Sequence, residues 1–148
     1  EMFNDAIVAI GNSSIRLKWI KKLKKLNYTI PSILHPSAWI SPSSTIQDGT
    51  VVFAQAAIQS NAIIGSGSII NTSSSVDHDC ILKEGVHICP GARLAGDVKV
   101  GEKSIVGIGA SINEGIFIGK NVIVGAGAAV ISDLDDNVIA KGVPAKLQ

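Results

Sequence analysis

An aliphatic residue recurs at every sixth position, without a break, over most of the chain. Ile, Val and Leu together number 44 of 148 residues. Chance would therefore give sixteen consecutive matches with a probability of about 10⁻⁸ or less. A period of six fits the two-residue period of a strand and excludes a helix, on which six residues advance by about 240°. The sixteen positions are Ile40, Ile46, Val52, Ile58, Ile64, Ile70, Val76, Leu82, Ile88, Leu94, Val100, Val106, Ile112, Ile118, Val124 and Val130.

A second row of mostly small or β-branched residues lies four positions after each aliphatic, for example Ala56, Ala62 and Ser68. One large and one small inward side chain per hexapeptide indicate a tightly packed triangular prism. Three hexapeptides then make one coil of about 18 residues, and coils stack at about 4.8 Å. We expect about five coils of parallel β-helix. Glycines that directly follow the aliphatic, such as Gly65 and Gly101, are expected to supply turns with unusual backbone dihedrals.

The residues before the repeat follow another pattern. Residues 5–10 predict a short strand, and residues 29–35 predict a second one. Between them, Ile15, Trp19, Leu23 and Leu26 form one helical stripe, and Arg16 and five lysines fill the other faces. We therefore divide the chain into a partial α/β, Rossmann-like segment (1–35), the β-helix (36–137) and a tail that leaves the prism (138–148).

Charge and composition narrow the function classes. The net charge of +1 gives no argument for nucleic acid. Residues 1–25 nevertheless carry six Lys or Arg against two Asp or Glu. This basic helix could attract phosphates, although a solvated face is the simpler interpretation. There is no run of about 18 apolar residues, so no membrane span is expected. Two cysteines and no signal peptide favour a reducing cytoplasm.

The stretch 71–80, NTSSSVDHDC, carries the strongest candidate chemistry. His78 lies between Asp77 and Asp79, and a histidine beside a carboxylate is the arrangement of a general base. We expect it outside the prism, near a corner, where it could also be a plain surface histidine. His87 is nine residues further on, which is half a coil. The two histidines therefore cannot share a site within one subunit, but they could share one between subunits of a trimer.

A zinc site built from the three histidines is a competing interpretation. His35 precedes His78 by 43 residues, which is not a multiple of 18, so the two do not stack. We therefore expect no metal. Cys80 occupies a small inward position and is predicted to be core, whereas the role of Cys89 stays open.

Several phrases resemble one family: HPSAWIS (35–41), IINTSSSVDHDC (69–80), VHICPGARLAGDVKVGE (86–102), INEGIFIGKNVIVGAG (112–127) and KGVPAK (141–146). They resemble bacterial sugar O/N-acetyltransferases of the hexapeptide-repeat superfamily, of the sialic acid O-acetyltransferase and UDP-4-amino-sugar N-acetyltransferase types. The resemblance implies a left-handed β-helix and acetyl-CoA as the donor, and we expect a cytoplasmic homotrimer from the composition and from the positions of the two histidines. It implies direct transfer to an amino or hydroxyl group of a nucleotide sugar, such as a UDP-4-amino-4,6-dideoxy sugar.

The resemblance also implies roles for single residues. His78 would be the general base, Asp79 the acid that raises its basicity, and Asn71 a substrate contact. The acetyl-CoA contacts would be His87 from a neighbouring subunit, the small or apolar positions Gly96, Ile108 and Ala126, and the tail lysines Lys141 and Lys146. The Gly-rich first turn of the family's nucleotide-binding domain is not found in this sequence, so we expect a truncated chain or a shortened gene. Two alternatives remain open: a non-catalytic β-helix scaffold, and a zinc hydratase of the gamma-carbonic-anhydrase type.

Overall fold

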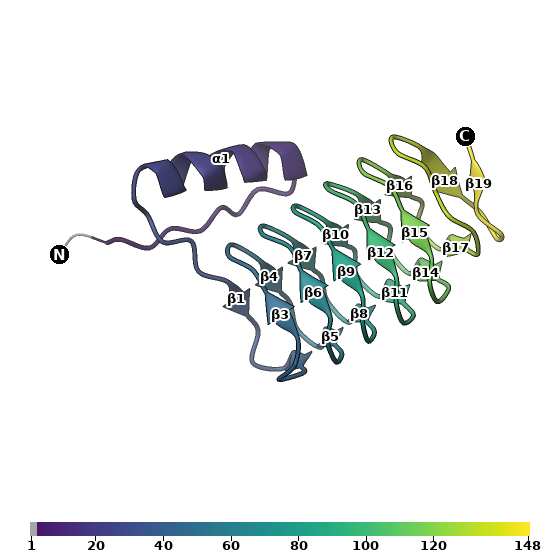
Figure 1. The fold of residues 1–148 in the computed structure, drawn as a ribbon, viewed down its shortest axis with the longest axis horizontal. Coiled ribbons are helices and arrows are strands. Elements are labelled where there is room, and N and C mark those ends of the chain that lie inside the picture. The colour runs from purple at the N-terminus through teal and green to yellow at the C-terminus, as the bar shows by residue number, and fades with distance from the viewer. Residues whose placement is uncertain (1–2) are drawn as a thin grey trace.

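The computed structural model describes residues 3–148, which form one helix beside a β-solenoid (Figure 1). The solenoid has three sheets of parallel strands, and as far as residue 130 the partners within each sheet lie 18 residues apart, as in the pairs His87 with Ile105 and Ile88 with Val106. Each hexapeptide supplies one strand and one corner, as the repeat predicts. The largest sheet has seven parallel strands, from β1 (Ile33–Leu34) to β18 (Ile139–Lys141), so the solenoid has about six coils rather than five.

The eight-stranded sheet contains, in order, β1 (Ile33–Leu34), β4 (Val51–Val52), β7 (Ile69–Ile70), β10 (His87–Ile88), β13 (Ile105–Val106), β16 (Ile123–Val124), β18 (Ile139–Lys141) and β19 (Lys146–Leu147). The six-stranded sheet contains β2 (Trp39–Ile40), β5 (Ala57–Ile58), β8 (Ser75–Val76), β11 (Arg93–Leu94), β14 (Ser111–Ile112) and β17 (Ala129–Val130). The five-stranded sheet contains β3 (Thr45–Ile46), β6 (Ile63–Ile64), β9 (Ile81–Leu82), β12 (Lys99–Val100) and β15 (Phe117–Ile118).

The core is the aliphatic interior that the repeat predicts. From Val52 to Val130, every sixth-position aliphatic is buried, and the second row is buried from Thr50 to Ala128. Large residues such as Ile58 and small ones such as Ala62 alternate along this interior. The interior is thus filled by side chains, and ligands must bind on the outside.

The glycines that follow the aliphatics have another role than the one expected. Left-handed backbone occurs three residues after the aliphatic instead, for example at Gly49, Gln55 and Asn61. A Cβ on Gly65 would lie 2.5 Å from the backbone carbon of Lys83 in the next coil. Such glycines are needed because the next coil passes too close for a side chain.

The helix α1 (Ser13–Lys25) packs against the turns that join the five-stranded to the eight-stranded sheet. Its Asn12 cap accepts a hydrogen bond from the Ile15 amide, 3.0 Å away. The apolar stripe found in the sequence is not the buried face of the helix, because Ile15 and Trp19 are exposed, as is Leu26 beyond the helix end. The buried face consists of Arg16, Leu17 and Ile20.

The Rossmann-like segment expected before the repeat is not formed within residues 3–35. Residues 5–10 make a single parallel bridge, Asp5 to Thr29, instead of a strand. Residues 33–34 form β1, which pairs with β4 and opens the solenoid. The segment around Val8 instead packs on α1 and Ile30, in a small second core that Leu17 and Ile20 complete.

The tail also differs from the expectation, because it continues the solenoid before it turns back. β18 pairs with β16 sixteen residues earlier, as Val124 does with Ala140, so the last coil is two residues shorter than the others. Ala140 is fully buried. The antiparallel β19 then returns along β18 and places Lys146 opposite Lys141.

Candidate active site

His78 projects from the corner that joins β8 of the six-stranded sheet to β9 of the five-stranded sheet. Its side chain is about half exposed, as the sequence predicts for a corner position outside the core. Its Nδ1 lies 2.8 Å from Oδ2 of Asp79. A carboxylate can only accept a hydrogen bond, so Nδ1 donates and Nε2 is left free to take up a proton.

The backbone of the corner places the Asp79 carboxylate beside the ring. Asp79 has a left-handed conformation, with φ of 60°, at the corner position that Asn61 occupies one coil earlier with φ of 59°. Asp and Asn tolerate this conformation better than other residues with a Cβ. Asn61 Nδ2 donates to Asp79 Oδ1 at 3.1 Å, so the carboxylate is held from both sides.

Gly96 lies one coil above His78 and makes room for its ring. A Cβ at this position would overlap His78 Cε1 and would lie 2.6 Å from Nε2. Gly96 itself is buried. Its small size is therefore explained by the His78 ring, whether or not a cofactor also approaches it.

The electrostatic surroundings make His78 a better base. The hydrogen bond that His78 donates to Asp79 raises the pKa of His78 above its ordinary value, and the charges of Asp77, Asp79 and Glu114 add to this effect. The same hydrogen bond lowers the pKa of Asp79, and the bond from Asn61 lowers it further. The pair can thus take a proton at Nε2 and stabilise the imidazolium that results.

His87 and Asn71 come together on the other side of the solenoid. His87 points outward from β10, and its Nε2 lies 3.1 Å from Asn71 Nδ2. The Asn71 Oδ1 already accepts from the Thr72 amide at 2.8 Å, so its Nδ2 is the group that faces the imidazole. Burial lowers the pKa of His87, and the nearby Arg16 charge lowers it further.

An apolar pocket of about 380 Å³ lies at this second histidine. Residues 7–11 form one wall, and the outward face of the eight-stranded sheet forms the other. Its polar groups are the side chains of Arg16, Asn71 and His87. We call it the Asn71 pocket; its apolar walls include Ile7, Ile10, Val51, Phe53 and Ile69.

The remaining candidates form two further groups. Ile108 and Ala126 are both exposed and lie one coil apart at the corner after the eight-stranded sheet, where the Gly127 amide donates to the Ile108 carbonyl. Lys141 and Lys146 face each other in the terminal hairpin and are exposed. One chain therefore does not gather the predicted residues into one site. It presents His78 with Gly96 at one corner, and Asn71 with His87 on another face.

The cysteines and the metal hypothesis can be placed as well. Cys80 is fully buried in the core, as predicted, and burial raises its pKa to about 11. Cys89 is half-buried, and burial raises its pKa too. Within residues 3–148 no group of three or more His, Cys, Asp or Glu side chains is placed to hold a metal ion.

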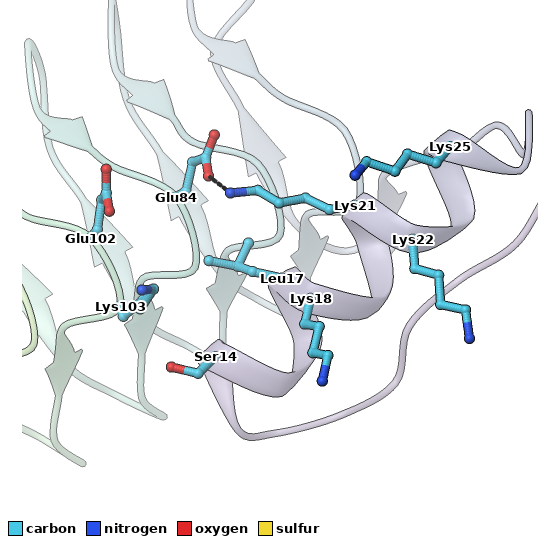
Figure 2. A pocket seen from close by; sticks show the side chains of 9 residues that line it. All are labelled: Ser14, Leu17, Lys18, Lys21, Lys22, Lys25, Glu84, Glu102 and Lys103. Carbon is cyan, nitrogen blue, oxygen red and sulfur yellow. Dashed lines mark ion pairs between the residues drawn. The ribbon is translucent and has the colours of Figure 1, made fainter.

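A lysine-lined cleft of about 560 Å³ lies between α1 and the neighbouring turns. Figure 2 shows Leu17 pointing toward the solenoid, and Lys21 reaching across to Glu84, with 3.7 Å between Nζ and Oε2. Lys18 and Lys22 extend away from the solenoid. With exposed lysines and two glutamates around it, the cleft holds no candidate catalytic group.

Sequence reasoning missed two residues of these sites. Asn61 orients Asp79, and its signal was available, because it lies 18 residues before Asp79 and so stacks on it. Arg16 is only 1% exposed, whereas the helical pattern had placed it on a solvated face. Its burial depends on which face of α1 packs against the solenoid, and the sequence pattern of the helix alone does not determine this face.

No protein-family model matches the chain. Comparison with solved structures is informative. The acetyltransferase domain of PglB from Neisseria gonorrhoeae is 40% identical, with a TM-score of 0.96 over 97% of this chain and 70% of that one. PerB from Caulobacter crescentus is 43% identical, with a TM-score of 0.97 over 98% and 70%. WeeI from Acinetobacter baumannii is 28% identical, with a TM-score of 0.95 over 100% and 72%.

These likenesses, together with the solenoid and its corner histidine, define an acetyltransferase. The chain belongs to the family of hexapeptide-repeat β-helix sugar N-acetyltransferases. The family assignment agrees with the resemblance that the motifs carry. No helix among residues 3–148 is long and apolar enough to cross a membrane.

Proposed function

We propose that this protein transfers the acetyl group of acetyl-CoA to the amino group of a nucleotide-linked amino sugar, with His78 as the general base. The observation that carries the proposal is the pair His78–Asp79, with its Nδ1 to Oδ2 distance of 2.8 Å and its free Nε2 at an exposed corner. Two relatives support the reactants: the PglB domain binds acetyl coenzyme A, and PerB binds CoA and GDP-perosamine.

The proposed step is a direct transfer. The amine nitrogen attacks the thioester carbonyl carbon, and its proton passes to Nε2 of His78. The C–S bond then breaks, and the CoA thiolate takes the proton from the imidazolium. Asp79 stays ionised throughout and stabilises the imidazolium through Nδ1. The proposed step passes through no acyl-enzyme, and Cys80, which is buried in the core, is not accessible as a nucleophile.

We further propose a homotrimer with sites between subunits. Support comes from the separation of the two histidine sites within one chain. The row that carries His87 offers an apolar contact surface, because Ile105, Ile123 and Ile139 continue it toward the C-terminal end. Ile123 and Ile139 are 44% and 47% exposed. A neighbouring subunit would bring the Asn71 pocket of one chain to the His78 corner of the next.

The donor contacts complete the proposal. Ile108 and Ala126 would line the pantetheine arm, Gly96 would lie near the thioester, and Lys141 and Lys146 would bind phosphate groups of CoA. These assignments, the left-handed sense of the coil and the UDP form of the sugar are parts of the proposal that rest on the resemblance, and the GDP form rests on PerB. The absence of a metal and a cytoplasmic location are further parts, which rest on the sequence arguments given above.

Two measurements test the proposal. Acetyl-CoA is mixed with the protein and a GDP- or UDP-linked 4-amino-4,6-dideoxy sugar, and release of the free thiol is followed. Turnover that needs the amino sugar supports the proposal, and its absence with both nucleotides contradicts the acceptor. Calorimetry with CoA tests the donor: the complete chain should bind, and the Lys141→Gln/Lys146→Gln variant should bind more weakly. Failure of the complete chain to bind CoA would favour the non-catalytic scaffold.

A further inference from the structure

Arg16 is the most unusual charged residue of the described chain, because it is fully buried without an acidic partner. No carboxylate within residues 3–148 forms an ion pair with it. Its guanidinium is bound by backbone carbonyls instead. Burial of a charge without a counter-charge is costly, and its pKa is lowered by that burial. Such a group needs its hydrogen bonds for the fold to tolerate it.

The four carbonyls belong to two different parts of the molecule. Nε donates to Gly67 O at 2.7 Å, and Nη2 donates to Gly85 O at 3.1 Å, both in turns of the solenoid. Nη1 donates to Ile10 O at 2.8 Å and to Gly11 O at 2.7 Å, both in the segment before α1. One side chain of α1 therefore ties residues 10–11 to two successive coils.

This tie is part of the Asn71 pocket. Residues 7–11 are one wall of the pocket, Arg16 lies in it, and Asn71 and His87 lie on the opposite wall. We propose that Arg16 is a positioning residue for the Asn71 pocket: it holds residues 7–11 over the eight-stranded sheet, and so fixes the wall that faces Asn71 and His87, the expected substrate contact and acetyl-CoA contact. The role in binding these reactants rests on the proposed function, whereas the clamp itself does not.

The hydrogen bonds support a neutral His87. The Asn71 amide faces Nε2 with its NH₂ group, because its oxygen is taken by the Thr72 amide. A donor facing Nε2 requires that this nitrogen carries no proton. Arg16 and His87 are the only titratable residues among those that line the pocket, and Asn71 is neutral. The Arg16 charge therefore acts in the same direction as the Asn71 amide and disfavours protonation of His87.

Three variants of the complete chain test the inference. Arg16→Met removes the charge and all four hydrogen bonds. Arg16→Lys keeps the charge and loses the planar fork that reaches both parts of the molecule. Lys18→Met is the matched control, because it removes a charge from the exposed side of the same helix. The readouts are the titration of the three histidines by NMR and the KM values for the amino sugar and for acetyl-CoA.

We expect Arg16→Met to raise the pKa of His87 and to raise the KM for at least one of the two reactants, the amino sugar or acetyl-CoA, by about tenfold or more. Arg16→Lys should keep the His87 titration near that of the wild type and should recover part of the loss in KM, including that for the sugar if it is affected. Lys18→Met should change none of these. If Arg16→Met does not fold, Arg16→Lys carries the test through its KM values.

Two outcomes would overturn the inference. One is a lower melting temperature for both Arg16 variants, with the His87 titration and both KM values unchanged, which would give Arg16 only a structural role. The other is an unchanged His87 titration together with a sugar KM that rises equally in Arg16→Met, Arg16→Lys and the control Lys18→Met. The rise would then not be specific to Arg16. Absence of turnover in the wild type would contradict the proposed function, and the His87 titration would then still decide whether Arg16 acts on this pocket.

Discussion

The two histidines of the candidate site lie half a coil apart and have opposite surroundings. His78 is exposed at a polar corner, where the Asp79 hydrogen bond raises its pKa. His87 is half-buried in an otherwise aliphatic row, where burial and the Arg16 charge lower its pKa. Their neighbours in the adjacent coils explain the contrast, because Asn61 and Gly96 flank the His78 corner, whereas Ile69 and Ile105 flank His87.

The difference shows how a repetitive scaffold makes one residue type serve two purposes. The backbone is nearly the same at each coil, so the chemistry of a position depends on which side chains stack above and below it. His78 is arranged to gain a proton and His87 to remain without one. The predictions below test this division of roles, beginning with the largest expected effect.

Removal of the proposed base should have the largest effect. His78→Ala should lower kcat by about 10²- to 10⁴-fold, because general bases contribute rate factors of this size. The melting temperature and the CoA affinity should hardly change, since the side chain is exposed and supports no core packing. Thiol release and calorimetry are the measurements, and His35→Ala, at another exposed histidine, is the control. Near-wild-type turnover in His78→Ala would remove the contrast between the two histidines.

Crowding the base should be the next largest effect. Gly96→Ala places a Cβ 2.6 Å from His78 Nε2, so the ring must move away from its bond to Asp79. We expect kcat to fall by about 10- to 100-fold, because small displacements of a reacting group are costly. In the double variant Gly96→Ala/His78→Ala the two losses should not add. Additive losses would show that Gly96 acts elsewhere, for example in donor binding.

Loss of the carboxylate should have a smaller effect on rate and a clear effect on pH dependence. A general base works in its neutral form, so kcat/KM of the wild type should fall as the pH drops through the raised pKa of His78, which lies above about 6.5. Asp79→Asn should lower kcat by about tenfold and move this midpoint to lower pH. Asp97→Asn, at the same corner position one coil later, is the matched control. A midpoint that stays in place in Asp79→Asn would contradict the role of Asp79.

The smallest effect concerns stability at the other histidine. The lowered pKa of His87 means that the unfolded chain takes up this proton more readily than the folded one. Its contribution to stability is therefore present above about pH 6.5 and is lost as the pH falls below that value. The melting temperature of His87→Gln should thus drop less than that of the wild type between pH 7 and pH 5, by a few degrees at most. An equal drop in both proteins would place His87 in a solvent-like environment.

The repeat made most of the solenoid predictable. The six-residue period follows directly from the packing of the core, because each inward side chain, such as Val76 or Leu82, must fill an equivalent space in its coil. The exposure of His78 and the burial of Cys80 followed from that register. The contact of Asn61 with Asp79 was predictable as well, because residues 18 positions apart stack on each other in successive coils.

The N-terminal part was less predictable, because its conformation depends on contacts far away in the sequence. The apolar stripe that the helical pattern shows includes Ile15 and Trp19, which are exposed, whereas the buried apolar residues are Leu17 and Ile20. The buried face is set by the solenoid turns at Gly67 and Gly85, which meet Leu17, Ile20 and Arg16. The pattern of apolar residues within the helix cannot predict which face contacts turns that lie about 50 to 70 residues away in the sequence.

The glycines beneath α1 have a consequence for registry. The backbone of a solenoid repeats from coil to coil. Each coil could therefore offer a helix the same packing surface, shifted along the solenoid axis by one strand spacing of about 4.8 Å. In the corner column under α1, the left-handed turn position is Gly49, Gly67 and Gly85. In the next two coils, the same position is Lys103 and Asn121, with the same sign of φ and a side chain in the way. The three glycines thus make these coils different from the next two, and the helix can pack closely only where they lie. They therefore fix the position of α1 along the axis of the solenoid.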